Sequence, residues 1–460
     1  MDQSLVFDLE LIKRYDKSGP RYTSYPTAVQ FHEGFGAAGY DRIARSSNAE
    51  RPPLSLYFHI PFCDTVCFYC ACNKIATKDR SKAQPYLDRV YKELAMQSEL
   101  FDSSRMVDQL HWGGGTPTFI SPAQMRELMT QTRKYFKLRD DDSGEYSIEI
   151  DPREVTSDSI KLLRELGFNR MSLGVQDFDP QVQKAVNRIQ SEAETMAVLD
   201  QARQAGFKST SIDLIYGLPF QTPESFSRTL DRILAVDPDR LSVFNYAHLP
   251  EMFPPQRRIK EDQLPSPQQK LDILQMTNER LQQAGYVYIG MDHFAKPGDE
   301  LAQAQREGHL YRNFQGYSTH ADCDLVGLGM TSIGKVGNSY SQNMRTMAEY
   351  CAAIDAGHLP LYRGVELDKD DLLRREIITE LMCNFALDTQ TIAAKYKINF
   401  AEYFAVEQSE IAQLQQDGLI TIAGSRIAVQ PAGRFLIRNV CMVFDKYLRQ
   451  SKEQRFSKVI

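Results

Sequence analysis

The sequence lacks any long apolar run, and this absence limits the class of protein that it encodes. None of the hydrophobic stretches in its 460 residues reaches the roughly 20 apolar residues that a membrane-spanning helix needs. Residues 1–17 carry acids among their apolar side chains, so they contain no hydrophobic region of the kind found in a secretory signal peptide. We therefore expect a cytoplasmic protein without a membrane span.

Basic charge is also in short supply. Lysine and arginine together number 54 against 60 aspartates and glutamates, which gives a net charge of −6 and a pI near 5.9. Nucleic-acid-binding domains carry a basic field, so this balance predicts no nucleic-acid partner. It still allows a local pocket of arginine or lysine that binds a carboxylated substrate.

Cysteine is scarce and unevenly placed. Four of the eight cysteines lie within residues 63–72, whereas a secreted disulfide framework distributes its pairs through a short chain. This cluster in a large chain indicates a metal or redox site. The scattered cysteines are expected to be small buried hydrophobes, as free cysteine commonly is: Cys323, Cys351, Cys383 and Cys441.

From residue 54 onward, short β-like runs alternate with amphipathic helical stretches. This alternation predicts parallel strands joined by crossover helices. Polar or glycine-rich segments follow one strand after another, and in a parallel barrel these strand ends converge on the face that carries the chemistry. The expected strands cover residues 54–60, 107–112, 146–150, 170–175, 209–215, 241–246 and 286–291.

Three domains are expected. Residues 1–50 read as an irregular leader rich in turn formers, and residues 51–365 as the barrel. Residues 366–460 read as a mostly helical domain with a β-hairpin over 418–429 and a last helix over 433–449. This order is typical of a winged-helix domain, but its charge does not support DNA binding.

The strongest motif is YFHIPFCDTVCFYC at residues 57–70, which spaces Cys63, Cys67 and Cys70 as CxxxCxxC. Three thiolates on one loop can hold three irons of a 4Fe–4S cluster and leave the fourth iron open to another ligand. The alternative is a structural zinc site with Cys72 as a fourth ligand. Zinc sites normally draw on two well-separated pairs of ligands, so the cluster is the favoured interpretation.

Further candidate residues lie at the other strand ends. The glycines of GGGTP at residues 113–117 let the backbone approach a ligand, although the same glycines suit a tight turn. Glu149 faces the barrel interior and needs a polar partner. Asp151 beside Pro152 reads as a simple Asp-Pro turn, while Asp213 at a later strand end is the better functional candidate.

Tyr57 and His59 precede the cysteines on the first expected strand. Residues two apart on a strand face the same side, so both side chains point toward one surface of the sheet. A lone histidine on a strand is more often a core residue, but this pair directly before the motif favours a functional role.

Together these segments resemble the oxygen-independent coproporphyrinogen III oxidases (dehydrogenases), a family of the radical S-adenosylmethionine (SAM) superfamily. The resemblance extends over almost the whole chain. It rests on the segments GPRYTSYPTA, LYFHIPFCDTVCFYCACNKI, LHWGGGTPT, IEIDPRE, NRMSLGVQDF, IDLIYGLP, RLSVFNYAHLP and GMDHFA.

The resemblance implies an α/β fold, namely an incomplete parallel (β/α) radical-SAM barrel with a mostly helical, winged-helix-like C-terminal domain, in a monomer. It implies that two propionate side chains of coproporphyrinogen III are converted to vinyls, which yields protoporphyrinogen IX. It also implies an electron donor and an electron acceptor, neither of which the sequence identifies.

The same resemblance implies one 4Fe–4S cluster, held by Cys63, Cys67 and Cys70, and two SAM molecules. The residues that resemble contacts to the cluster-bound SAM are Tyr57, Gly114, Glu149 and Ile333. Those that resemble contacts to the second SAM are Tyr69, Gly115, Thr116, Gln176, Arg188, Asp213 and Ala247. The catalytic candidates are Tyr57, His59 and Cys72, of which Cys72 matches a family cysteine that does not bind iron.

Three other functions are compatible with parts of the pattern. One is a haem chaperone on the same scaffold, which binds haem and does not oxidise coproporphyrinogen; such relatives typically lack the fourth cysteine and the leader present here as Cys72 and residues 19–28. The second is a radical SAM enzyme with another substrate, such as a methyltransferase. The third is a zinc-stabilised interaction protein. We favour the oxidase because it accounts for all of the motifs.

Overall fold

The structure is a computed structural model that describes residues 5–450 and divides into two compact units. Unit 1 comprises Met1–Gln30, Asn278–Ala321 and Leu367–Ile460, and unit 2 comprises Phe31–Thr277 and Asp322–Glu366. Within the described residues, no helix combines the length and the apolar character needed to cross a membrane.

Unit 2 is built on a curved sheet with the strand order β9-β8-β7-β6-β4-β1-β14-β15-β16-β17 and with β5 beside β4. The strands from β9 to β14 pair in parallel and those from β14 to β17 pair antiparallel. The predicted incomplete parallel barrel is therefore confirmed. The bounds are β1 Leu54–Ile60, β4 Met106–Gly114, β5 Lys137–Leu138, β6 Glu145–Ile150, β7 Arg170–Gln176, β8 Ser209–Tyr216, β9 Arg240–Asn245, β14 Asp324–Leu328, β15 Ile333–Val336, β16 Ser339–Asn343 and β17 Leu361–Glu366.

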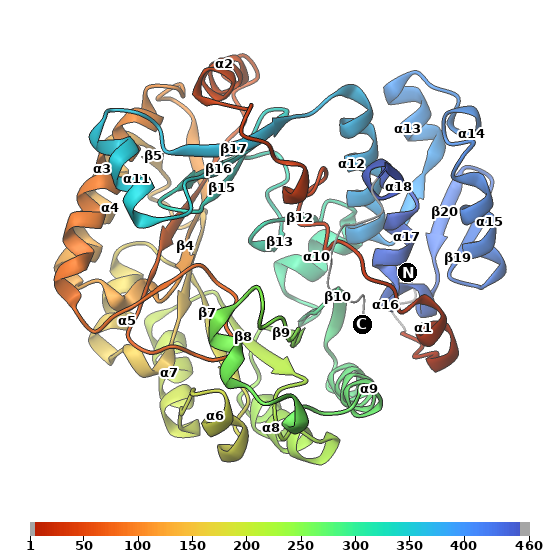
Figure 1. Ribbon diagram of the computed structural model, residues 1–460, viewed down its shortest axis with the longest axis horizontal. Coiled ribbons are helices and arrows are strands. Elements are labelled where there is room, and N and C mark those ends of the chain that lie inside the picture. Colours follow the sequence, from red (N-terminus) through yellow and green to blue (C-terminus); the bar gives the residue numbers. More distant parts are fainter. Residues whose placement is uncertain (1–4, 451–460) are drawn as a thin grey trace. The chain divides into compact units, whose positions relative to one another are not determined.

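Helices line the outer side of this sheet (Figure 1). Capping boxes at Ser121, Ser191 and Thr222 start three of them, and Gly206, at φ +83°, ends the helix over residues 192–205, as its sequence predicts. The bounds are α2 Ala37–Ser47, α3 Ala83–Ser98, α4 Pro122–Tyr135, α5 Ser157–Glu165, α6 Pro180–Ala185, α7 Glu192–Ala205, α8 Pro223–Val236, α9 Pro267–Gln283, which crosses the boundary between the units, and α11 Met347–Asp355.

Apolar and polar side chains alternate along the central strands, so that one face of the sheet is apolar and the other is polar. Apolar residues such as Leu110, Ile148 and Ile212 are fully buried. The intervening residues are polar and less buried, and the strand register places them in rows: Tyr57 beside His111, His111 beside Ser147, Glu149 beside Ser172, and Asp213 beside Ser242. The sheet therefore packs its apolar face on the helices and offers its polar face to a ligand.

A buried acid supports the chain between β14 and β15. Glu93 on α3 accepts hydrogen bonds from the Gly329 N–H (2.8 Å), the Tyr350 hydroxyl (2.6 Å) and the Asn343 amide (2.7 Å). Burial raises the pKa of Glu93 to about 7, and these three bonds oppose that rise. The network fixes the turn that leads into Ile333 at the start of β15.

Unit 1 contains the C-terminal helices and small antiparallel sheets. The expected strand over 286–291 is β10, which pairs antiparallel with β11, while β18, β20 and β19 form a separate three-stranded sheet. The bounds are α1 Leu9–Tyr15, β10 Val287–Gly290, β11 His293–Ala295, α10 Glu300–Glu307, β12 Tyr311–Asn313, β13 Gly316–Ser318, α12 Lys369–Asn384, β18 Ala386–Asp388, α13 Thr389–Tyr396, α14 Phe400–Tyr403, α15 Gln408–Gln416, β19 Ile420–Ala423, β20 Arg426–Val429, α16 Pro431–Phe435, α17 Ile437–Met442 and α18 Lys446–Gln450.

The expected hairpin over 418–429 is present as β19 and β20, but the single last helix over 433–449 is wrong. The structure breaks that stretch into α16, α17 and α18. The second break has a clear cause, because the Asp445 carboxylate accepts hydrogen bonds from the backbone N–H groups of Tyr447 (2.9 Å) and Leu448 (3.3 Å). An aspartate in this position caps a new helix and so ends the previous one.

Candidate functional site

The cysteine loop begins where β1 ends and is held at both of its ends. β2 (Phe62–Cys63) pairs with β3 (Ile75–Ala76), which closes the loop upon itself. Farther along, the Phe68 N–H donates to the Val186 carbonyl (2.9 Å) and the Asn187 amide donates to the Val66 carbonyl (2.8 Å). The loop is therefore a fixed platform attached to β1 and to the segment after α6.

The sulfurs of the predicted cluster ligands have different surroundings. Cys67 is buried, Cys63 and Cys70 are half-buried, and Cys72 is exposed. The Thr116 hydroxyl donates to the Cys63 sulfur at 3.6 Å. A hydrogen bond from the Cys72 thiol lowers the pKa of Cys70, and the same bond raises the pKa of Cys72.

The spacing of the thiols bears on the choice between zinc and a cluster. A single tetrahedral zinc with Zn–S bonds of 2.3 Å would hold its sulfurs about 3.8 Å apart. Among the described residues, no three of the sulfurs of Cys63, Cys67, Cys70 and Cys72 lie within 4.8 Å of one another. The thiols are therefore not gathered around one tetrahedral point, and three cysteine thiols on one loop are the donor set that a 4Fe–4S cluster takes.

The glycine segment after β4 packs directly on the cysteine loop. The Gly115 N–H donates to the Ile60 carbonyl (2.8 Å) and the Thr116 N–H donates to the Phe62 carbonyl (2.7 Å). A Cβ on Gly115 would lie 2.6 Å from the Phe62 carbonyl oxygen, and one on Gly114 would lie 2.6 Å from the His59 ring. The closeness of these contacts explains why glycine is required here.

Tyr57 and His59 point to the same side of β1, and they contact each other. The His59 Nε2 lies 3.0 Å from the Asn73 carbonyl oxygen, which can only accept, and burial lowers the pKa of His59. A neutral ring with its proton on Nε2 follows, so the Tyr57 hydroxyl donates to Nδ1 at 3.1 Å. The Tyr57 ring also stacks on His111, with centroids 5.8 Å apart.

Glu149 stands beside the glycine segment. Its carboxylate accepts from the Gly114 N–H (3.1 Å) and from the His111 Nε2–H (3.4 Å). Partial desolvation alone would raise the pKa of Glu149, but these hydrogen bonds outweigh it and lower the pKa. The side chain keeps 46% of its surface exposed, so this anion remains accessible to a ligand with hydroxyl or ammonium donors.

Asp213 lies two strands away on the same polar face. Its carboxylate accepts from the Ser172 hydroxyl at 3.1 Å. Burial and the negative charge of Glu149 raise the pKa of Asp213 to about 6, against the opposing effects of Ser242, Ser172 and Arg188. Glu149 and Arg188 therefore both lie close enough to Asp213 to change its pKa.

Arg188 and Asp151 meet at the buried cysteine. The Nη1 of Arg188 donates to the Cys67 sulfur (3.5 Å) and to Asp151 Oδ2 (3.1 Å), and its Nη2 donates to the Gly174 carbonyl (2.5 Å). Asp151 also accepts two hydrogen bonds from the Arg153 guanidinium, whose Nη2 lies 3.8 Å from the same sulfur. Asp151 thus does more than form the expected turn.

Two buried polar atoms near this point have no partner among the described residues: Gln176 Oε1 and Arg188 Nε. Gln176 also has a positive φ of 70°, which is rare for a residue with a side chain. A buried donor and a buried acceptor left unpaired are expected where a polar ligand binds. This part of the site fits a second SAM molecule, which carries both donors and acceptors.

The remaining predicted contacts are distributed around the same unit. Tyr69 lies on the cysteine loop and packs against an apolar cluster that includes Val186 and Tyr246. Ala247 is exposed just beyond the end of β9, and Ile333 is half-buried at the start of β15. All of the predicted site residues therefore lie in unit 2.

Sequence reasoning missed Arg153 and His111 as parts of this site. His111 carried an available signal, because it lies on a central strand beside Tyr57 in the register. Arg153 carried none, because it lies in a short 3₁₀ turn and reaches the cysteine only through the fold. Of the scattered cysteines, Cys323, Cys383 and Cys441 are buried as expected, whereas Cys351 is half-buried.

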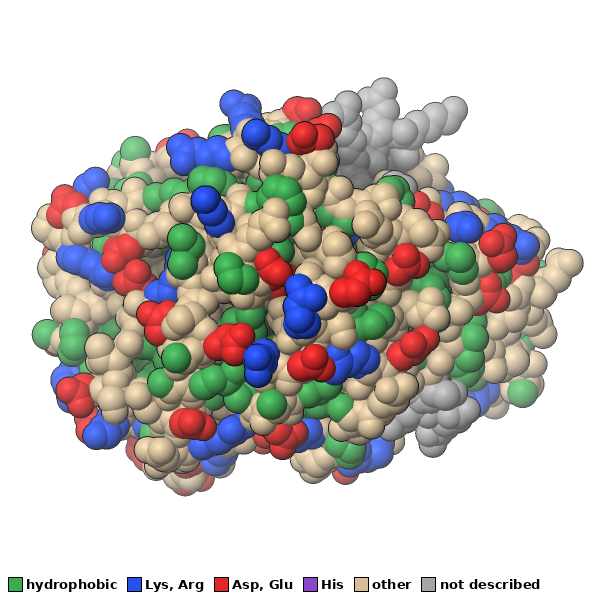
Figure 2. Space-filling view, turned by 90° about the horizontal axis from the view of Figure 1, so that it is seen from below, with side chains coloured by type: hydrophobic (Ala, Val, Ile, Leu, Met, Phe, Trp, Pro, Cys, Tyr) green, Lys and Arg blue, Asp and Glu red, His purple; other side chains and the backbone are tan. Residues whose placement is uncertain are grey.

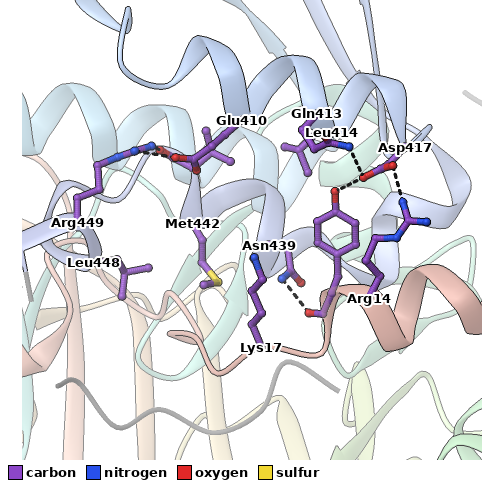
Figure 3. A pocket seen from close by; sticks show the side chains of 12 residues that line it. Arg14, Lys17, Glu410, Gln413, Leu414, Asp417, Asn439, Met442, Leu448 and Arg449 are labelled. Carbon is purple, nitrogen blue, oxygen red and sulfur yellow. Dashed lines mark hydrogen bonds and ion pairs between the residues drawn. The ribbon is translucent and has the colours of Figure 1, made fainter. Parts of the chain in front are cut away.

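A separate cavity of ≈ 410 Å³ lies within unit 1 (Figure 3). The Arg14 guanidinium and the Tyr15 hydroxyl both donate to Asp417 at 2.6 Å, and Arg449 donates to Glu410 at 2.7 Å. Its arginines are thus already paired with carboxylates, and no cysteine lines it. It is lined by Arg14, Tyr15, Lys17, Glu410, Gln413, Leu414, Asp417, Asn439, Met442, Val443, Leu448 and Arg449.

Surface charge is mixed on the face shown in Figure 2. Lysine and arginine side chains alternate with aspartate and glutamate, and neither sign covers a continuous area. This face therefore offers no basic stripe of the kind that binds a nucleic-acid backbone.

Comparison with known proteins identifies the family of this chain. The Radical SAM superfamily matches residues 57–233, and the HemN C-terminal domain matches residues 367–436. A curated relative from Pseudomonas aeruginosa, named oxygen-independent coproporphyrinogen III oxidase, is 54% identical over 100% of both chains. A relative of the same name from Escherichia coli is 52% identical over 100% of this chain and 99% of its own.

A solved structure, described as coproporphyrinogen III oxidase (HemN) from Escherichia coli and as a radical SAM enzyme, matches with a TM-score of 0.92 and 50% identity. The match covers 96% of this chain and 100% of that one. A cysteine loop and a glycine segment on a parallel half-barrel thus define a radical SAM protein. Within that class, the chain belongs to the oxygen-independent coproporphyrinogen III oxidase family.

Proposed function

We propose that this chain oxidises coproporphyrinogen III to protoporphyrinogen IX without oxygen. Each of two propionate side chains loses carbon dioxide, one hydrogen atom and one electron, and becomes a vinyl group. The observation that carries the proposal is the identity above 50% over the full length of relatives named for this activity, together with the cysteine loop and glycine segment. The haem chaperone alternative is not favoured, because none of these relatives carries that name.

In this proposal the residues divide into cluster ligands, contacts to the first SAM, contacts to the second SAM and catalytic candidates. Cys63, Cys67 and Cys70 hold a 4Fe–4S cluster and leave one iron open. The cluster and SAM, when bound, supply a 5′-deoxyadenosyl radical that can take hydrogen from an unactivated carbon, which no side-chain base can remove as a proton. Every other contribution of the protein is binding, orientation and the exclusion of water.

The cluster-bound SAM is assigned to the side of the site nearest the cysteine loop. Gly114 brings its backbone close to the ligand, and Glu149 presents an accessible carboxylate beside it. Tyr57 covers the same side through its stack on His111. Ile333, which the Glu93 network positions, completes this group.

The second SAM is assigned to the later strands. The unpaired Gln176 Oε1 and Arg188 Nε supply one acceptor and one donor, and Asp213 supplies a carboxylate for hydroxyl groups. Tyr69, Gly115, Thr116 and Ala247 complete the proposed set. The catalytic candidates remain His59, Tyr57 and Cys72, of which the exposed Cys72 is the most open to substrate.

Finer aspects of the proposal concern the whole protein. We propose that it works in the cytoplasm as a monomer and uses an electron donor and an acceptor that are still to be identified. The proposed domain order is the leader at 1–50, the barrel at 51–365 and the C-terminal domain at 366–460.

The deciding experiment is anaerobic turnover. Protein with a reconstituted cluster is incubated with a reductant, SAM, an electron acceptor and coproporphyrinogen III, and the products are identified by mass. Formation of protoporphyrinogen IX with 5′-deoxyadenosine supports the oxidase. Tight haem binding without turnover would instead support the chaperone, and methyl transfer to substrate would support a methyltransferase.

A further inference from the structure

Two arginines and one aspartate surround the sulfur of Cys67. Arg153 donates through Nε to Asp151 Oδ1 (2.9 Å) and through Nη2 to Oδ2 (2.6 Å), while Arg188 Nη1 binds the same Oδ2 at 3.1 Å. Both guanidinium groups then reach the sulfur, Arg188 at 3.5 Å and Arg153 at 3.8 Å. Asp151 thereby fixes the orientation of both arginines.

The charges of this group do not cancel by themselves. The side chains of Arg153, Asp151 and Arg188 are only 17%, 11% and 8% exposed, and together they carry one surplus positive charge. Burying a surplus cation is costly unless an anion lies beside it. The Cys67 sulfur lies beside both arginines and becomes a thiolate when it binds iron, so it can supply this negative charge.

A cation beside a cluster ligand affects the equilibrium between the oxidised and the reduced cluster. Reduction by one electron adds one negative charge to a 4Fe–4S cluster, and hydrogen bonds to its ligand sulfurs and nearby charge set the reduction potential. We propose that Arg153, oriented by Asp151, is a tuning residue that favours the reduced cluster by donating to the Cys67 sulfur. The proposal rests on Cys67 being a cluster ligand, as in the proposed function.

Arg153 is the residue to test, because Arg188 is also assigned to the second SAM. The described hydrogen bonds of the Arg153 side chain go to Asp151 and Cys67. Neither residue is among the proposed SAM contacts. A matched control is Arg164, which makes the same paired contact with Asp142 (2.7 Å and 3.1 Å) and otherwise binds the Gly206 carbonyl.

The experiment is a redox titration of the reconstituted holoenzyme, without SAM, followed by the paramagnetic signal of the reduced cluster. At the potential where the parent cluster is half reduced, Arg153→Gln is expected to lower the ratio of reduced to oxidised cluster about tenfold, which is 59 mV for one electron. Arg153→Lys keeps the charge and should recover most of this ratio. Arg164→Gln should leave it unchanged.

The outcomes separate this inference from the ligand assignment. An Arg153→Gln protein with full iron and the parent's ratio would overturn the tuning role. If Arg153→Gln fails to hold iron, the titration of Arg153→Lys against Arg164→Lys decides. Lysine keeps the charge but cannot repeat the paired contact, so Arg153→Lys should give a ratio slightly but reproducibly below that of Arg164→Lys, and equal ratios would overturn the tuning role. Full iron in Cys67→Ser would overturn the ligand assignment itself, whatever Arg153 does.

Discussion

Each of the three ligand cysteines has its own electrostatic surroundings. Cys63 faces a neutral hydroxyl, Cys67 faces two guanidinium groups, and Cys70 is paired with a neighbouring thiol. Burial raises the pKa of Cys63 to about 11, so iron must displace a tightly held proton there. The three sulfurs are thus chemically distinct before any cluster binds.

Removing any one of these thiols should abolish the cluster. Cys63→Ser, Cys67→Ser or Cys70→Ser leaves two thiolates where three irons need three, so iron and sulfide content is expected to fall to background after anaerobic reconstitution. The matched control is Cys72→Ser, which should keep its iron. Near-full iron in any of the first three variants contradicts the assignment, and iron loss in Cys72→Ser would indicate a four-cysteine site.

Asp213 gives the second SAM a pH dependence. A charge-assisted hydrogen bond contributes about 1.5–3 kcal/mol, so Asp213→Asn should weaken the second equivalent of SAM about tenfold or more. Since the pKa of Asp213 is raised to about 6, the carboxylate is charged above that pH and loses its charge below it. Affinity of the parent for the second equivalent should therefore fall between pH 7.5 and pH 5.5, while that of the variant stays flat.

Equilibrium binding on anaerobic protein measures both effects, and the paramagnetic spectrum of the cluster reports on the first SAM. If Asp213→Asn still bound two equivalents as tightly as the parent, Asp213 would not belong to the second site. If the cluster of the variant no longer responded to SAM, the division of residues between the two sites would be wrong.

At this scale the sequence identified residues by motif and failed where contact depends on the fold. Cys63, Cys67 and Cys70 were predicted as ligands from one motif, and the structure places them on one loop. Asp151 was predicted to be only part of a turn, because its second partner, Arg188, lies 37 residues away in the chain. A long-range ion pair leaves no periodic signal in a sequence.

Among the elements, the link from β4 to α4 is packed closely against β1. Gly114 sits at φ +113° in close contact with His59, and His59 is itself held by Tyr57 and Asn73. The glycine segment is therefore held in place by direct contacts with β1 and with the cysteine loop.

Gly114→Ala should destabilise the protein through a steric clash with His59 as well as through backbone strain. The new Cβ would lie 2.6 Å from ring atoms of a histidine that cannot turn away. We expect a loss of about 1–3 kcal/mol in the free energy of unfolding and weaker binding of the first SAM. Urea unfolding and SAM binding on anaerobic protein measure the two effects.

Gly206→Ala is the matched control, because it has a similar positive φ of +83° but its nearest neighbour lies 4.0 Å away. It should cost about 1 kcal/mol and leave SAM binding unchanged. Equal effects of the two substitutions on SAM affinity would show that the contact with His59 carries no weight.

The elements themselves were predictable to very different degrees. The strands β1, β4, β6, β7, β8 and β9 lie close to their predicted positions, because each is a β-like run bounded by turn residues, whereas β2, β3 and β5 have two residues each and were not predicted. The strands β14 to β17 were not expected, because Gly327, Gly334 and the polar residues of β16 obscure their pattern. The last helix was expected to be continuous, because the capping role of Asp445 cannot be told from an ordinary helical aspartate.

For the molecule as a whole, the open iron predicts sensitivity to air. A cluster with one iron not held by the protein is exposed to oxygen, so iron and activity should be lost together on aeration. Far-UV circular dichroism should change little, because the sheet does not depend on the cysteine loop for its pairing. Full activity after prolonged aeration, or activity that outlasts the iron, would contradict the mechanism.

Sample handling provides the control for this experiment. Cluster-loaded protein kept without oxygen for the same time should lose neither iron nor turnover. A parallel loss in that sample would point to general instability rather than to attack on the open iron.

The closed cysteine loop has a consequence for the working life of the enzyme. All three proposed ligands lie within eight residues, and the β2–β3 ladder and the contacts to Val186 and Asn187 hold that loop independently of the metal. A molecule that loses its cluster to oxygen should thus keep the folded cysteine loop that binds the cluster. We therefore expect that new iron and sulfide can rebuild the cluster in such a molecule, so that turnover returns without synthesis of new protein.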